Sequence, residues 1–264
     1  SNLNAGTYIV DATDANGCIT SETVTMTEPS TAIISSYTQS DFNGVGVSCN
    51  GDSDGSIDLS VTGGVGVHTY AWSNGSTSED LSLIGAGTYS VVSTDNNGCT
   101  TTETIIITES VALTSFYTQS DYNGFGVSCN GDSDGSIDLS VNGGVDNQNY
   151  TYVWNDAFTS EDRILLGAGT YSVVVTDANG CTSSETVVIS EPASLTSSFT
   201  TSNWNGYEIQ CNGGNNGDIT LNVLGGVVAL PYSYEIDGIS NSTNFFSNLN
   251  AGTYIVDATD ANGC

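Results

Sequence analysis

The sequence predicts an all-β fold: tandem immunoglobulin-like β-sandwich repeats of about 82 residues each, in an elongated array. Three observations support this prediction. The passage at 47–61 recurs unchanged at 127–141, and a weaker copy follows at 209–223. Apolar and polar residues alternate in short runs, which is the period of a half-buried strand. No run shows the 3.6-residue apolar period of an amphipathic helix.

Each repeat contains several segments that are typical of strands. In GSIDLSV, at 55–61, alternate residues are apolar, namely Ile57, Leu59 and Val61. The segments YAW at 70–72 and YVW at 152–154 predict a second strand, and an Asn-Gly turn near residue 180 predicts a hairpin between two more. About seven short strands are expected in each repeat. A tyrosine corner is expected at the start of the sixth strand, formed by Tyr8, Tyr89, Tyr171 and Tyr254.

The repeat boundaries follow from the spacing of four Asn-Gly-Cys turns. Their cysteines, Cys18, Cys99, Cys181 and Cys264, are 81, 82 and 83 residues apart. Residues 1–18 are identical to 247–264, so three units form a larger repeat of 246 residues, and we expect the sequence to be a window from a longer array. The expected domains are 1–28 (closing strands of a preceding repeat), 29–109, 110–191, and 192–264 without its last strand.

Composition limits the possible functions. The chain has a net charge of −29, with Arg163 as its one basic residue besides a lone histidine, His68. Nucleic acids and anionic lipids require basic clusters, so we expect no nucleic-acid partner and no direct membrane insertion. Acid–base and nucleophilic catalysis require paired groups, whereas His68 stands opposite Tyr150 and Tyr232 in the other repeats. We therefore expect a protein that is not an enzyme.

An acidic loop in the first two repeats is a candidate calcium site. NGDSDGSID, at 50–58, has oxygen-bearing residues at alternate positions and a glycine at the sixth, as in the first part of a calcium loop. The glutamate of an EF-hand and its flanking helices are absent. A turn rich in Asp and Gly that binds no metal is an equal alternative. The candidate ligands are Asn50, Asp52, Asp54 and Asp58, and in the second repeat Asn130, Asp132, Asp134 and Asp138.

The seven cysteines predict disulfides between repeats. Cys49 precedes the second strand and Cys99 follows the sixth, so the sandwich places them about 30 Å apart, whereas a disulfide tolerates a Cα separation of only ~7 Å. Head-to-tail repeats would instead join Cys49 to Cys181 and Cys129 to Cys264, with the Asp52/Asp54 loop near Asp177. Cys18, Cys99 and Cys211 would then pair outside the sequence. An extra hairpin before Cys49 would return it to Cys99.

The order Cys-Asn-Gly, Gly-Gly, Tyr-x-Trp, Gly-Thr-Tyr and Asp-x-Asn-Gly-Cys resembles the SprB-type repeat of giant mobile surface adhesins in gliding Bacteroidetes. The resemblance covers essentially the whole chain, although Ile236 replaces the tryptophan of the third repeat and the acidic loop is lost there. It implies a repetitive shaft of an extracellular, outer-membrane-associated filament for gliding motility and surface attachment. The implied partners are the neighbouring repeats and the motility or secretion machinery of the cell envelope.

Two other functions remain open. The repeats could themselves bind polysaccharide or substratum, or they could assemble laterally in a surface layer. The binding alternative depends on a column of aromatic residues, each followed by Asn-Gly: Phe42, Tyr122 and Trp204. These residues could stack on sugars or pack against the neighbouring repeat.

Overall fold

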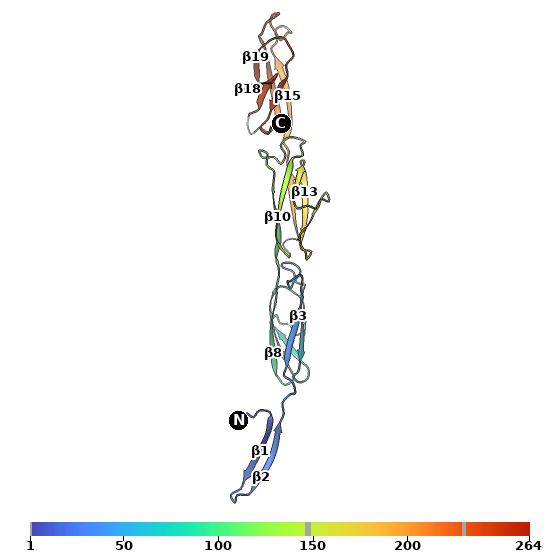
Figure 1. The fold of residues 1–264 in the computed structure, drawn as a ribbon, viewed down its shortest axis with the longest axis vertical. Helices are drawn as coiled ribbons and strands as arrows, with labels where there is room; N and C mark the ends of the chain where they lie inside the picture. The colour runs from blue at the N-terminus through green and yellow to red at the C-terminus, as the bar shows by residue number, and fades with distance from the viewer. Residues whose placement is uncertain (1, 146–148, 229–230) are drawn as a thin grey trace. The chain divides into compact units, whose positions relative to one another are not determined.

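The computed structural model describes residues 2–145, 149–228 and 231–264. These residues form twenty β-strands and no helix, which confirms the all-β prediction (Figure 1). Accordingly, no described segment is a helix suited to crossing a membrane. The chain divides into two compact units, residues 1–111 and 112–264, which are described separately below.

The first unit holds a hairpin and one complete repeat. The hairpin pairs β1 (Gly6–Thr13) with β2 (Ile19–Met26). The repeat consists of two three-stranded antiparallel sheets, ordered β3-β4-β6 and β5-β7-β8. Its strands are β3 (Ile34–Gln39), β4 (Gly55–Thr62), β5 (Thr69–Trp72), β6 (Leu81–Ile84), β7 (Gly87–Thr94) and β8 (Thr100–Ile107).

This arrangement is the immunoglobulin-like sandwich with one strand fewer than expected. The sheets correspond to strands A, B and E and strands C, F and G of that fold, and strand D is absent. The prediction of about seven strands is therefore wrong: the repeat has six. Residues 73–80, between β5 and β6, form a turn. At its start the Trp72 amide donates to the Ser76 carbonyl (3.0 Å), and at its end the Asp80 carboxylate accepts from the Leu59 amide (2.9 Å). These residues therefore form no further strand in this repeat.

The alternating pattern places the core between the two sheets. Ile57 and Leu59 are 1% and 2% exposed, as predicted, while the intervening residues of β4 face solvent or lie partly buried. The Trp72 ring is buried and its Nε1 donates to the Ser78 carbonyl (2.9 Å), which compensates the cost of burying that polar atom. The core residues are Val47, Ile57, Leu59, Trp72, Leu81, Ile84, Val91, Ile105 and Ile107.

The second repeat, in the second unit, has the same topology. Its sheets are ordered β12-β10-β9 and β11-β13-β14. The strands are β9 (Val111–Gln119), β10 (Gly135–Gly144), β11 (Thr151–Trp154), β12 (Arg163–Leu166), β13 (Gly169–Thr176) and β14 (Thr182–Ile189). Its core contains Val127, Ile137, Leu139, Trp154, Leu166, Val173, Val175, Val187 and Ile189.

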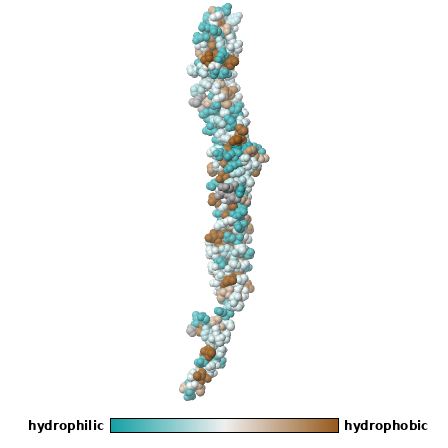
Figure 2. All heavy atoms as spheres, in the orientation of Figure 1, coloured by the Kyte–Doolittle hydropathy of each residue, from teal (hydrophilic) through white to brown (hydrophobic). Residues whose placement is uncertain are grey.

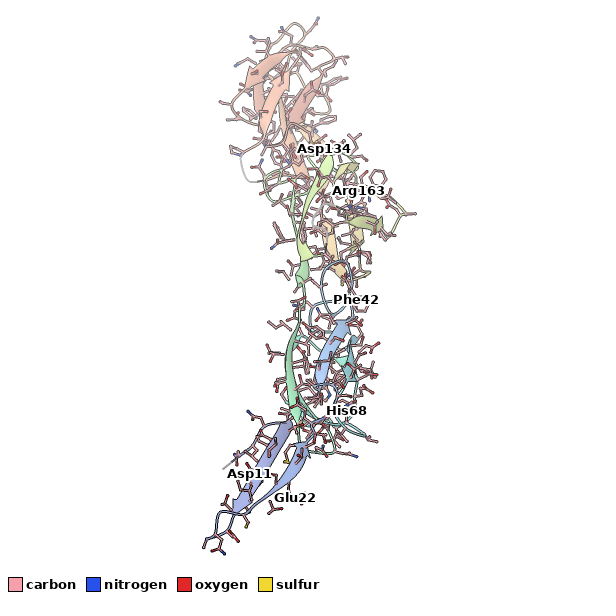
Figure 3. All side chains as sticks on the ribbon, turned by 60° about the horizontal axis from the view of Figure 1, so that its bottom comes forward. Asp11, Glu22, Phe42, His68, Asp134 and Arg163 are labelled. Atoms are coloured by element: carbon pink, nitrogen blue, oxygen red, sulfur yellow. A yellow bond between two sulfur atoms is a disulfide. The ribbon has the colours of Figure 1, made fainter. Side chains whose placement is uncertain are left out.

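Arg163 occupies the buried position at the start of β12 that Leu81 occupies in β6, and it lies in the second repeat (Figure 3). Its guanidinium donates to both carboxylate oxygens of Asp156 (3.1 and 2.6 Å). It also lies over the rings of Trp154 (5.2 Å) and Phe158 (4.4 Å). The charge is therefore compensated within the repeat.

The third repeat has sheets ordered β15-β16-β19 and β18-β17-β20. Its strands are β15 (Ala193–Thr201), β16 (Gly217–Gly226), β17 (Ser233–Ile236), β18 (Ile239–Asn241), β19 (Phe245–Leu249) and β20 (Val256–Thr259). The strand β20 has four residues, whereas its counterparts β7 and β13 have eight and each pairs with a following strand. Among the described residues, β20 pairs with β17 alone.

Tyrosine corners occur at all four predicted positions. Each hydroxyl donates to the backbone carbonyl of the residue four positions earlier. The pairs are Tyr8 with Asn4 (2.9 Å), Tyr89 with Gly85 (3.0 Å), Tyr171 with Gly167 (3.0 Å) and Tyr254 with Asn250 (2.9 Å). This bond ties the connection before the strand to the strand itself, so the prediction is confirmed.

Candidate functional site: the junction between repeats

The acidic loop is closed by hydrogen bonds within itself. The Asp54 carboxylate accepts from the Ser48 amide (3.0 Å), and the Asp52 carboxylate accepts from the Ser48 hydroxyl (3.0 Å). Ser128, Asp134 and Asp132 repeat both bonds at 3.0 Å. Hydrogen bonds from the Ser48 side chain and amide lower the pKa of Asp54, because they stabilise the ionised form. The carboxylates therefore stabilise the turn.

The loop is also fixed to the end of its own repeat. The Asn50 side-chain nitrogen donates to the Ser110 carbonyl (2.8 Å), and the Gly51 amide donates to the Glu109 carboxylate (2.8 Å). In the second repeat Asn130 bonds to the Pro192 carbonyl (3.0 Å) and Gly131 to Glu191 (2.8 Å). Each loop thus binds the chain that leaves the last strand of its repeat.

The candidate calcium ligands do not gather around one point in the described residues. Asp58 and Asp138 are exposed residues within β4 and β10 and lie outside the loop turn. Throughout residues 2–145, 149–228 and 231–264, no three His, Cys, Asp or Glu side chains are placed to hold a metal ion. In the third repeat, Asn216 takes the place of Asp54 and accepts from the Gln210 amide (3.2 Å), so the turn persists without a carboxylate. These observations favour the turn over the metal site.

Substitutions in this loop test the conclusion. We expect Asp134→Asn to leave the melting temperature nearly unchanged, because Asn216 performs the same role, whereas Asp134→Ala lowers it by removing the acceptor for the Ser128 amide. Chelators should shift neither variant nor the parent protein. Thermal unfolding with and without EDTA measures both effects, and a fall caused by EDTA alone would restore the calcium hypothesis.

A second acidic position organises the Asn-Gly-Cys turns. The buried Asp260 carboxylate accepts from the amides of Val227 (2.7 Å), Asn262 (2.9 Å) and Cys264 (3.0 Å). Burial acts to raise the pKa of Asp260, but the amide hydrogen bonds together outweigh burial and lower it. Asp95 and Asp177 make the same three kinds of bond in their own repeats. The expected contribution of Asp177 to the Asp52/Asp54 loop stays a prediction, because the two belong to different compact units.

Each aromatic of the predicted column begins a tight turn. Backbone bridges join Phe42 to Val45, Tyr122 to Phe125 and Trp204 to Tyr207. The Asn-Gly pair of each turn has positive φ at both residues, for example 54° at Asn123 and 95° at Gly124, as a type I′ turn requires. The Tyr122 hydroxyl donates to the Asp134 carbonyl (3.3 Å), so this ring bonds within its own repeat.

Within the second unit, this turn and the acidic loop receive the Asn-Gly-Cys turn of the third repeat. Cys129 and Cys264 form a disulfide, with their Cα atoms 5.7 Å apart, and this is the pair that the head-to-tail argument predicts. The Asn262 side-chain nitrogen donates to the carbonyls of Tyr122 (3.1 Å) and Ser128 (2.8 Å), and its oxygen accepts from Asn123 (2.6 Å). We call these contacts the Asn–Cys junction.

In the part of the chain that the structure describes, the other five cysteines do not form disulfides within the second unit or are not placed relative to their predicted partner. Cys18, Cys99 and Cys211 are exposed free thiols among the described residues, so Cys99 does not bond to Cys49. Cys49 and Cys181 belong to different compact units, and their pairing stays a prediction.

The role of Asn262 was not predicted from the sequence. The pair Asn-Gly is typical of a turn, which explains the glycine but not the asparagine side chain. A signal was present, because asparagine precedes Gly-Cys in all four turns, at Asn16, Asn97, Asn179 and Asn262.

The histidine of the first repeat has a structural role. The His68 ring nitrogen bonds to the Gly63 carbonyl (3.0 Å), as the hydroxyls of Tyr150 and Tyr232 bond to those of Gly143 (2.6 Å) and Gly225 (2.7 Å). His68 therefore fills a strand-end position, as the sequence alignment of the repeats predicts.

The fold and the junction define a class: a repeat protein of small β-sandwiches, in which consecutive repeats are covalently joined in the second unit. Residues 45–77, 127–159 and 208–241 match the SprB repeat, once in each sandwich. The chain therefore contains three segments that are similar to the SprB repeat. Each matched segment starts at or just after the end of the aromatic turn and contains the loop that follows it and the next two strands. The loop carries Cys129, the receiving cysteine of the junction, in the second repeat.

No curated protein sequence matches the chain. Among solved structures, similarity is found to one described as "Ca2+-stabilized adhesin helps an Antarctic bacterium reach out and bind ice". The two are 18% identical, the match covers 98% of this chain and 78% of that one, and the TM-score is 0.34. At this level of similarity, neither the fold nor the function of that protein can be assigned to this chain.

Proposed function

We propose that the chain is a segment of the repetitive shaft of a long extracellular cell-surface adhesin. The presence of three SprB repeats supports this function. The observation that carries it is the Asn–Cys junction, in which a disulfide and three side-chain hydrogen bonds hold consecutive repeats together. A disulfide transmits tension between domains without depending on a large interface. It also suits the oxidising environment outside the cell.

The proposed role is structural and not enzymatic. The chemically distinctive side chains have structural partners: Arg163 bonds to Asp156, His68 to a carbonyl, and the buried carboxylates of Asp95, Asp177 and Asp260 to backbone amides. Figure 2 shows apolar residues as separate spots on the visible face and not as one broad patch. Such a surface suits repeats whose contacts with one another lie at their ends.

We further propose that the filament serves gliding motility and attachment to surfaces. The filament would be secreted, associate with the outer membrane and be moved by machinery of the cell envelope. Polysaccharide or substratum would bind at a distal part or along the shaft. The strongly negative charge of the chain is compatible with neutral sugars and with cations, and it opposes binding to nucleic acid.

Direct binding by the repeats is the second candidate. It is favoured by Trp204 and Tyr207, which are 43% and 72% exposed on one turn. The corresponding Tyr122 turn contacts the third repeat, which favours packing between repeats at that position. Replacing Trp204 and Tyr207 by alanine separates the candidates: lost adhesion with unchanged unfolding would support direct binding, and unchanged adhesion would support the shaft.

Solution scattering tests the shaft. Strands of eight to ten residues span about 30 Å at ~3.3 Å per residue. We therefore expect each repeat to add about that length plus a junction, so that three repeats extend on the order of 100–130 Å. A maximum dimension typical of a compact globule of this mass would contradict the proposal.

A further inference from the structure

The third repeat carries an open hollow at the end where its aromatic turn lies. The hollow has a volume of about 400 Å³ and is lined in part by Tyr207, Gln210 and Cys211. Cys211 is an exposed free thiol among the described residues. Trp204 and Tyr207, which bridge to each other across the turn, are both exposed.

The matching place in the second repeat is occupied. There Cys129 corresponds to Cys211, the Tyr122 turn to the Trp204 turn, and Ser128 to Gln210. Asn262 and Cys264 of the third repeat fill it. Both oxygens that accept hydrogen bonds from Asn262 are backbone carbonyls, so the change from Ser128 to Gln210 leaves that chemistry available in the third repeat.

The group that fills this place is preorganised before it docks. In the β1–β2 hairpin, where Cys18 is free, the Asp14 carboxylate accepts from the amides of Asn16 (2.8 Å) and Cys18 (2.8 Å). Asp260 makes the same two bonds in the docked turn, at 2.9 and 3.0 Å. Docking therefore requires little ordering of the turn, which reduces its entropic cost.

We propose that the hollow around Cys211 is a binding site for the Asp-x-Asn-Gly-Cys turn of a further SprB repeat. The asparagine amide of that turn donates to the carbonyls of residues 204 and 210, and its cysteine forms a disulfide with Cys211. The two thiols lose two protons and two electrons to a disulfide oxidant, which departs as two thiols. This inference depends on the Asn–Cys junction and not on the adhesive role.

A second copy of the chain supplies the probe, because it carries this turn at Cys18 and at Cys99. Equal amounts of ¹⁵N-labelled and unlabelled chain are mixed with oxidised glutathione, and disulfides are mapped without reduction. We expect links from Cys211 of one copy to Cys18 or Cys99 of another, and none between two Cys211 residues. A random mixture of all free-cysteine pairs, links within single copies alone, or glutathione adducts alone would overturn the proposal.

Substitution of the asparagine tests recognition separately from thiol chemistry. Asn16 and Asn97 do not have positive φ, so the backbone tolerates replacement there. The double variant Asn16→Asp, Asn97→Asp keeps the side-chain shape and removes the donors, and we expect disulfide-linked dimers to form about tenfold more slowly. Asn74→Ala, in an Asn-Gly turn without cysteine, is the matched control and should not slow dimer formation. An equal rate in the double variant would overturn recognition by asparagine.

Discussion

Removing the disulfide between Cys129 and Cys264 should lower the free energy of unfolding of the second and third repeats by about 2–5 kcal/mol. The two cysteines are 135 residues apart, and closing a loop of this length removes a large part of the conformational entropy of the unfolded chain. The same change should weaken the coupling between the two repeats, because the remaining Asn262 contacts are hydrogen bonds, each of which contributes only about 0.5–1.5 kcal/mol.

Urea unfolding of Cys129→Ser and Cys264→Ser measures this effect. Trp154 is buried in the second repeat and Trp204 lies in the third, so fluorescence of single-tryptophan variants reports each repeat separately. We expect coincident transitions in the parent protein and separate ones in the variants. Cys211→Ser is the matched control, since that thiol is free, and it should leave both midpoints in place. Unchanged midpoints in the Cys129 variant would show that the disulfide does not couple the repeats.

Much of the fold was predictable because its signals are local. Alternation placed Ile57 and Leu59 in the core, and Gly-Thr-Tyr placed the tyrosine corners. The pairing of Cys129 with Cys264 followed from topology, since a sandwich separates the strand ends that carry Cys49 and Cys99. The approximate length of a strand is enough to keep Cys49 and Cys99 too far apart for a disulfide.

Other features depend on side-chain direction, which the sequence pattern does not specify. Asp52 and Asp54 match the spacing of calcium ligands, but Ser48 is close enough to take both as hydrogen-bond acceptors. Arg163 is a charged residue in a core column, and it is tolerated because Asp156 and three aromatic rings surround it. The missing fourth strand depends on how residues 73–80 are used in a turn, which was not evident from composition.

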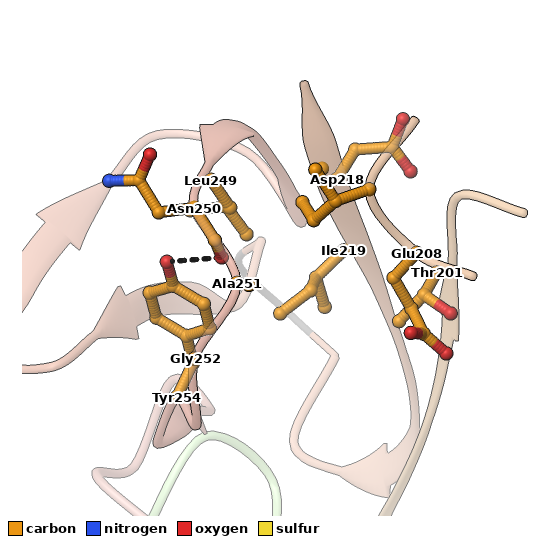
Figure 4. A pocket seen from close by; sticks show the side chains of 11 residues that line it. Thr201, Glu208, Asp218, Ile219, Leu249, Asn250, Ala251, Gly252 and Tyr254 are labelled. Atoms are coloured by element: carbon orange, nitrogen blue, oxygen red, sulfur yellow. Dashed lines mark hydrogen bonds between the residues drawn. The ribbon is translucent and has the colours of Figure 1, made fainter. Parts of the chain in front are cut away.

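Completing the third repeat with one more strand should stabilise it by about 3–6 kcal/mol. In the first repeat, β8 supplies Ile105 and Ile107, which are 0% and 1% exposed. In the third repeat the corresponding region is a hollow of about 200 Å³ lined by Ile209, Leu249 and Tyr254, among others (Figure 4). We interpret this hollow as the space of a missing strand and not as a ligand pocket.

Glycine packing supports this interpretation. A Cβ added at Gly55 would meet the Ile107 side chain at 3.2 Å, and one at Gly135 would meet Ile189 at the same distance. At the corresponding Gly217, the nearest atom belongs to Ile209, which stands where Val47 and Val127 stand in the other repeats. Ile209 thus reaches into space that an incoming isoleucine fills elsewhere.

The sequence indicates which strand fits. Residues 1–18 are identical to 247–264, and they are followed by β2, so Ile19–Glu28 is the natural extension to place after Cys264. Within β2, Val24 and Met26 align with Ile105 and Ile107, yet they are 46% and 44% exposed in the hairpin. Burying two such side chains gives the expected gain, at about 1.5–3 kcal/mol each.

The extended chain should unfold at a higher temperature in its third repeat, and amide exchange should slow along β20 as it acquires a second neighbouring strand. The matched control carries the same extension with Val24→Ser and Met26→Ser, which keeps the backbone hydrogen bonds but not the apolar burial. We expect the control to recover only a small part of the gain. If the two extensions stabilised the third repeat equally, the apolar side chains of the added strand would not fill the hollow. If neither extension stabilised it, the boundary of that repeat would lie elsewhere.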